Sequence, residues 1–221
     1  MANMKIFSGI SPPPLLARLL RPTRSEEPAA LRAFLRRQAA FVAQKTVLDY
    51  CRVKAGRQEQ RVMADPDFRA ALRHCRWQVF LPALADVTAL IEAWLRPHAE
   101  GREPVLAAAL VRLHVEALAA EPVPPEEVEA AEAALRALPG HLAALQLEPP
   151  WPAHRLPLLA EAPLFATLPV HPDQRRGEAP AIRGALRFHI VSTQQEMERA
   201  FAPAALAGRL LATAAVPEPA G

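Results

Sequence analysis

Residues 29–61 read AALRAFLRRQAAFVAQKTVLDYCRVKAGRQEQR, and this stretch decides the class of the fold. It contains no proline and a single glycine, Gly56, so we expect one long helix or two helices joined at that glycine. Leu31, Leu35 and Val42 lie near one side of such a helix. Their spacing produces an apolar stripe, which is typical of a helix packed against a protein core.

A second long helix is predicted for residues 67–96. Asp65 and Pro66 are a suitable N-cap and first-turn pair. Apolar residues at helical spacing then form one stripe: Phe68, Leu72, Cys75, Val79, Leu84, Val87, Ile91 and Trp94. Pro82 lies in the interior of this helix, where it removes one backbone hydrogen bond and predicts a kink near Gln78.

Prolines divide the rest of the chain into shorter segments. Helix signals predict further helices at 104–120, 125–138, 141–147 and 204–215. Pro139 and Gly140 predict the break between the second and third of these. Residues 149–180 combine many prolines with many apolar side chains, so we expect an extended strap packed across the helices. Residues 182–191 alternate apolar and other side chains, which favours a short strand.

Composition supports a mainly α-helical protein. The chain of 221 residues has 46 alanines and 30 leucines against 14 valines and 5 isoleucines, so strong helix formers dominate. An all-β sandwich or barrel is excluded, and a parallel α/β sheet is disfavoured. We expect an extended basic leader (1–28), a helical bundle of about four long helices (29–147), and a strap with a short strand and short terminal helices (148–221).

The charge distribution and the cysteines indicate the class of partner and the cellular compartment. Residues 1–100 carry a net charge of +7 and residues 101–221 a net of −4, which gives +3 for the chain. A net charge this small does not indicate nucleic-acid binding. Both cysteines, Cys51 and Cys75, fall in predicted helices among apolar neighbours, which indicates free buried thiols in a reducing, cytoplasmic compartment.

One polar stripe crosses the first long helix. Gln38, Lys45, Asp49 and Arg52 are separated by 7, 4 and 3 residues and therefore share a face. Two interpretations remain open: a structural salt-bridge network or solvated face, and a polar ligand site. A buried network predicts that loss of Asp49 destabilises the fold.

Two further clusters are candidate sites for a ligand or partner. His74 and Arg76 lie just before the Pro82 kink, where His74 could bind a ligand or could be a partly exposed structural histidine. Asp86 is a candidate acid for Arg76 or Lys45. In the strap, His171, Arg175 and Arg176 stand in a polar loop that could bind an anion or could be an ordinary surface turn.

Motifs of common enzyme classes are missing from the sequence. It has no phosphate-binding loop, no dinucleotide-binding turn, no nucleophile elbow, and no histidine or cysteine spacing typical of a metal site. We therefore expect no catalytic residues, no cofactor and no metal, and an enzyme is the less favoured interpretation.

Two functions remain as hypotheses. The first is a non-catalytic helical interaction or scaffold protein of the bacterial-cytosol type, with a protein partner. In a peripheral-membrane version, the basic, leucine-containing residues 15–24 contact a membrane surface. The alternative is a small helical enzyme or carrier of an apolar or anionic ligand. Its apolar pocket lies between the long helices and is rimmed by Lys45, Asp49, Arg52 and His74.

Overall fold

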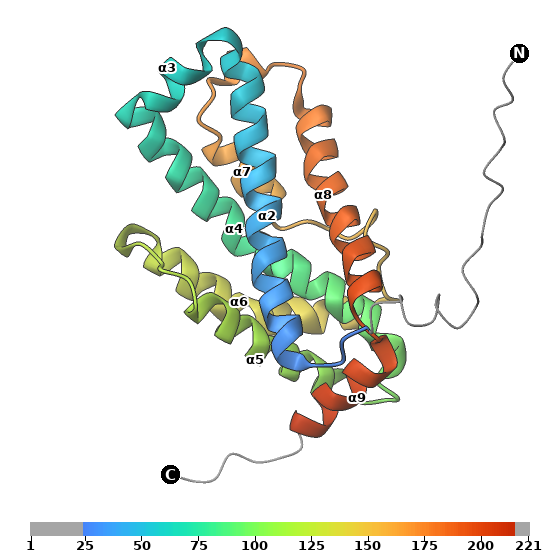
Figure 1. Ribbon diagram of the computed structural model, residues 1–221. Coiled ribbons are helices and arrows are strands. Elements are labelled where there is room, and N and C mark those ends of the chain that lie inside the picture. Colours follow the sequence, from blue (N-terminus) through green and yellow to red (C-terminus); the bar gives the residue numbers. More distant parts are fainter. Residues whose placement is uncertain (1–23, 215–221) are drawn as a thin grey trace, which may run out of the picture.

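The computed structural model describes residues 24–214 and confirms a mainly α-helical fold (Figure 1). The α-helices are α2 (Pro28–Ala55), α3 (Glu59–Ala64), α4 (Pro66–Leu95), α5 (Glu103–Ala119), α6 (Val128–Gln146), α7 (Glu161–Thr167), α8 (Ala179–Ala200) and α9 (Pro203–Ala214). Four 3₁₀ turns connect them: η1 (Gly56–Gln58), η2 (Arg96–His98), η3 (Pro125–Glu127) and η4 (Pro172–Arg175).

Local chemistry sets the ends of the two long helices as expected. Pro28 opens α2, and Gly56 follows its last residue with a φ of 51°, a conformation that glycine adopts without strain. Asp65 caps α4 by accepting a hydrogen bond from the Phe68 backbone N–H at 2.8 Å, and Pro66 occupies the first turn. Pro82 lies inside α4 without ending the helix.

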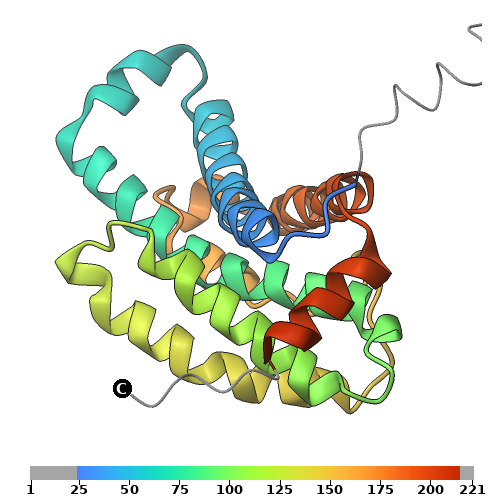
Figure 2. The same cartoon turned by 60° about the horizontal axis from the view of Figure 1, so that its bottom comes forward.

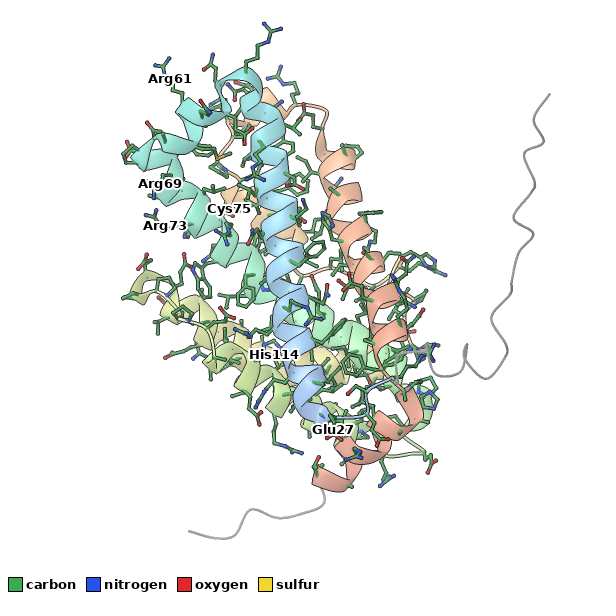
Figure 3. All side chains as sticks on the ribbon, viewed as in Figure 1. Glu27, Arg61, Arg69, Arg73, Cys75 and His114 are labelled. Carbon is green, nitrogen blue, oxygen red and sulfur yellow. The ribbon has the colours of Figure 1, made fainter. Side chains whose placement is uncertain are left out.

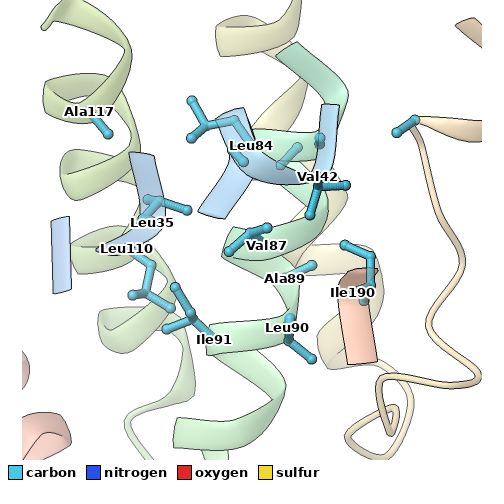
Figure 4. Close-up of a cluster of buried hydrophobic side chains, with 14 of the residues drawn as sticks. Leu35, Val42, Leu84, Val87, Ala89, Leu90, Ile91, Leu110, Ala117 and Ile190 are labelled. Atoms are coloured by element: carbon cyan, nitrogen blue, oxygen red, sulfur yellow. The ribbon is translucent and has the colours of Figure 1, made fainter. Parts of the chain in front are cut away.

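Helix α4 is the centre of the fold. Between Val79 and Leu95 nearly every side chain is buried, and the helix contacts α2, α5, α6, α7, α8 and α9 (Figure 2). Apolar side chains from α2, α5 and α8 meet those of α4 in one cluster (Figure 4). By length and composition, Pro66–His98 could cross a membrane, but 83% of its most apolar window is buried inside the protein. The apolar character of α4 is therefore that of a core helix.

The predicted strand at 182–191 is wrong, because these residues belong to α8. Ile182, Leu186 and Ile190 are buried at a spacing of four residues, whereas Phe188 is 67% exposed. The apolar residues of 182–191 fit both the two-residue period of a strand and the period of a helix. Packing of α8 on α2 stabilises the helix. Within residues 24–214, extended pairing is limited to one parallel bridge between Ser25 and Phe201.

The predicted break at Pro139 is also wrong, since α6 runs through it. Pro139 lacks one backbone N–H, and the Leu138 and Leu142 side chains on either side are fully packed in the core. Tertiary packing of these leucines stabilises a helix that local propensity alone disfavours.

The proline-rich segment forms helical turns rather than a continuous extended strap. Its chain contains α7 and η4, and Leu156, Leu164 and Leu168 are buried among the helices. Two polar side chains hold its backbone. Asp86 of α4 accepts hydrogen bonds from the backbone N–H groups of residues 159 and 160, at 2.7 and 3.0 Å. Arg187 of α8 donates to the carbonyl oxygens of residues 153 and 156.

Burial raises the pKa of Asp86 to about 7, against the opposing effects of those two N–H groups and of the Arg187 charge. The carboxyl group is fully enclosed by protein. Its geometry is therefore that of a structural acceptor for the following segment, and the predicted pairing of Asp86 with Arg76 or Lys45 is not formed.

The start of the described chain is tied to its end. The Ser25 backbone N–H donates to the carbonyl of Ala200 at 2.8 Å, and Arg209 of α9 pairs with Glu26 at 2.5 Å. Residues 1–23 lie outside the described residues, and with them most of the predicted leader (1–28) and of the predicted membrane contact (15–24).

Candidate functional site

Five exposed arginines mark one side of α3 and the first half of α4. Three of them, Arg69, Arg73 and Arg76, are separated by four and three residues and therefore share one face of α4. Arg57 in η1 and Arg61 in α3 come from the adjoining turn and helix. Figure 3 shows Arg61, Arg69 and Arg73 projecting from the outer side of these helices. We call these five residues the arginine face.

The arginine face lacks acidic partners. Within the described residues, no carboxylate oxygen lies within 4.0 Å of any of its five guanidinium groups, whereas many other arginines of the fold form ion pairs. Arg76 donates only to the amide oxygen of Gln44, at 3.3 Å. Five exposed cations that form no ion pair favour an anionic partner over a basic one.

A groove adjoins the arginine face between α2 and α4. It has a volume of about 220 Å³ and is lined by Ala40, Ala43, Gln44, Arg73, Arg76, Trp77, Phe80 and Glu121. The Trp77 and Phe80 rings meet edge to face, with centroids 5.4 Å apart. Glu121 in this lining is paired with Arg36 at 3.0 Å. The groove therefore combines an apolar wall with a cationic rim.

His74 does not face this groove but anchors the turn η3. Its Nδ1 lies 2.7 Å from Glu127 Oε1, and Gln78 donates to the other carboxylate oxygen at 2.7 Å. The Glu127 side chain is 1% exposed, so its two oxygens are satisfied by α4 side chains alone. This cluster holds η3 against α4 beside the arginine face.

The polar stripe of α2 divides into a buried and an exposed part. Gln38 is buried and bonds to Glu196 of α8. Lys45 and Asp49 form an ion pair at 2.5 Å with both side chains 43% exposed, and Arg52 pairs with Glu59 at 3.3 Å. The interpretation of the stripe as one buried network is therefore wrong, because α8 covers only its first part.

Lys45 and Asp49 instead line an apolar groove between α2 and α8. Its volume is about 480 Å³, and its lining is Lys45, Thr46, Asp49, Tyr50, Val53, Ala181, Ile182, Gly184, Ala185, Phe188 and His189. Arg52 and His74, the other two predicted rim residues, do not line it. The structure thus brings together two of the four side chains that the carrier hypothesis requires.

The predicted cluster at η4 is held by local bonds. Arg175 donates to the carbonyl of Phe165 at 2.7 Å, and Arg176 pairs with Asp173 at 2.7 Å. His171 Nδ1 accepts from the backbone N–H of Asp173 at 3.3 Å. These side chains shape the turn before α8.

Reactive groups typical of enzymes are few in the described part of the chain. No group of three histidine, cysteine or acidic residues there could hold a metal ion. Burial raises the pKa of Cys51 to about 12 and that of Cys75 to about 11, so both remain thiols at neutral pH. His114 is buried in the core, where desolvation lowers its pKa to about 4.

Several residues of these sites were not identified from the sequence. Arg57 could have been found as a helical position without an acid three or four residues away, whereas Asp65 stands four residues from both Arg61 and Arg69, so this signal does not identify those two. Glu127 gave only the signal of a first-turn acid, and its partners lie about 50 residues earlier in the chain. No local signal indicates the positions of Thr46 and His189 in a shared groove.

No family model, curated protein or solved structure matches the chain. Function is therefore inferred from the geometry and charge of these residues.

Proposed function

We propose that this chain is a non-catalytic interaction protein that binds an acidic protein segment through its arginine face. The observation that carries this proposal is the group of five exposed arginines without acidic partners, beside a groove with an aromatic wall. Arginine and aromatic side chains are the residues that contribute most to protein interfaces. An acidic segment would pair with the guanidinium groups and place one apolar side chain against Trp77.

A protein segment fits this surface better than a nucleic acid or a membrane. The groove of about 220 Å³ accepts one side chain, and its wall is apolar as well as cationic. The net charge of the whole chain is only +3, whereas binding dominated by phosphate groups depends on broad positive charge. The closeness of Glu121 adds a selective element, because it disfavours an anion at that end of the groove.

Binding of a labelled acidic peptide tests the proposal. The probe is a glutamate-rich peptide with one central leucine, and the reference is the same peptide with lysine in place of each glutamate. Fluorescence anisotropy should detect the acidic peptide only, with affinity that falls as salt is added. The double variant Arg69→Glu and Arg73→Glu should weaken binding by at least about tenfold, a loss typical of central interface arginines.

The matched control is Arg102→Glu with Arg112→Glu. It makes the same change in charge at exposed positions of the α5 region, away from the arginine face. Binding should change by less than about twofold in this control, since distant surface charges are screened. An equal loss in both variants contradicts the proposal, because it indicates a general charge effect. Tighter binding to duplex DNA or to anionic vesicles contradicts the class of partner.

A further inference from the structure

The α2–α8 groove contains two buried polar atoms that have no partner. Among the described residues, buried side-chain nitrogen or oxygen atoms without a hydrogen-bond partner occur at four places: Thr46, His114, His141 and His189. Two of these, Thr46 Oγ1 and His189 Nδ1, belong to residues that line this one groove. Thr46 is 2% exposed, and a buried hydroxyl group without a partner is unfavourable.

Most of the remaining lining of the groove is apolar and includes small residues. Ala181, Gly184 and Ala185 of α8 leave the space open, and an added Cβ at Gly184 meets no atom within 4 Å. Phe188 stands 67% exposed at the edge and Val53 78% exposed. Side chains of this kind at the surface of a hollow of about 480 Å³ are typical of a ligand site rather than of solvated surface.

Charge and aromatic contacts restrict the ligand further. At the rim, Lys45 and Asp49 neutralise each other in their ion pair. Phe41 and Phe188 flank the His189 imidazole edge to face, with centroids 5.4 and 5.6 Å away. Burial lowers the pKa of His189, so its ring is neutral at physiological pH. Both inner hydrogen-bonding groups are thus uncharged, and the surroundings favour an uncharged ligand.

We infer that the α2–α8 groove binds an uncharged molecule made of an apolar ring system with one hydroxyl group. The rings occupy the space over Ala181, Gly184 and Ala185, beside Phe188, and the hydroxyl group reaches Thr46 and His189. Each unpartnered atom then gains a hydrogen bond, and Phe188 is covered by the ligand. This site is separate from the arginine face and does not depend on its function.

Binding of 2-naphthol to the full chain tests this inference, with naphthalene and 2-naphthoate as reference ligands. Titrations followed by protein NMR should show tighter binding of 2-naphthol than of either reference. The imidazole nitrogen signals of His189 should shift with 2-naphthol and remain in place with naphthalene. Equal affinity for 2-naphthol and naphthalene, tighter binding of 2-naphthoate, or no binding of 2-naphthol overturns the inference.

Two variants separate the polar contact from the apolar space. Thr46→Val keeps the shape of the side chain and should weaken 2-naphthol by roughly fivefold to tenfold, the value of one hydrogen bond, while naphthalene is unaffected. Gly184→Leu fills the groove and should abolish binding of both ligands, whereas Gly208→Leu in α9 should leave both unchanged. Cβ atoms at both glycines meet no neighbour within 4 Å, so both variants are expected to fold. Unchanged 2-naphthol binding in Gly184→Leu overturns the inference.

Discussion

The two halves of α4 are one helix in two different environments. Residues 66–78 are covered mainly on one side and expose Arg69, Arg73 and Arg76 to solvent. Residues 79–95 are enclosed on almost every side, and their polar groups are bonded within the protein. The two parts of one continuous helix can therefore have different roles. The enclosed half has no polar group left to bind a ligand, whereas the exposed half has cations without partners.

The polar groups of the enclosed half show how complete this internal bonding is. Glu92 and Arg96 pair at 2.6 Å, and Arg96 also donates to the carbonyl of Glu148. Gln146 of α6 donates both to Glu92 and to the carbonyl of Glu103, at 2.8 and 2.9 Å. One buried ion pair thus connects the end of α4 with the start of α5 and the end of α6.

The largest effect is expected for Glu92→Ala in this enclosed half. The substitution leaves the Arg96 charge buried without its acid, which costs about 3–5 kcal/mol. Chemical denaturation should show this loss in the free energy of unfolding. Glu132→Ala is the matched control, because Glu132 and Arg136 have the same spacing of four residues but are both exposed. That control should change the free energy of unfolding by less than about 0.5 kcal/mol. Equal losses in the two variants would contradict the difference between the buried and the exposed ion pair.

Asp86→Ala should also be strongly destabilising. It removes the acceptor of two backbone N–H groups, at Leu159 and Ala160, and each unsatisfied group costs about 1–3 kcal/mol. Hydrogen exchange should show faster exchange of amides in the segment around residue 159 before any other region. If exchange accelerates evenly over the whole chain, Asp86 does not act through this segment.

Acid should destabilise the enclosed half through His114. Its Nδ1 lies 2.9 Å from Thr88 Oγ1, which donates its own proton to the Leu84 carbonyl, and Nε2 has no partner. Burial lowers the pKa of His114 to about 4, whereas the unfolded chain takes up this proton below about 6.5. The unfolded state therefore binds more protons between these values, and stability falls as pH falls from 6.5 towards 4.

A comparison with His114→Leu isolates this effect. The protonation of Asp86 contributes equally in the wild-type protein and in His114→Leu, so it cancels when their free energies of unfolding are subtracted. Relative to the variant, the wild-type protein should lose roughly 3 kcal/mol between pH 7 and pH 4, from the difference in pKa. Unfolding curves at several pH values measure it. A difference that does not vary with pH would show that His114 has the same pKa in both states.

The smallest effect on stability is expected in the exposed half. Arg69→Ala with Arg73→Ala removes two side chains that have no ion-pair partner in the described structure, so stability should change by less than about 0.5 kcal/mol. The same variant should lose affinity for the acidic peptide. A large loss of stability would show that these arginines are structural, and the two halves of α4 would then differ less than the geometry indicates.

The sequence predicted the helical class and most of the helix ends, including Gly56 after α2 and Asp65 before α4. These features depend on φ restrictions and cap bonds between residues within four positions of each other. Local signals misled at 182–191 and at Pro139, where apolar residues packed on distant helices outweigh propensity.

Only the tertiary structure decided which polar groups are free. Lys45 and Asp49 are exposed because α8 leaves that part of α2 open, and Glu127 is buried because α4 meets it from about 50 residues away. The same long-range packing leaves the arginine face without ion-pair partners and places Thr46 and His189 in one groove. Helix formation is governed by neighbours in sequence, whereas burial and pairing are governed by neighbours in space, which a single sequence does not specify.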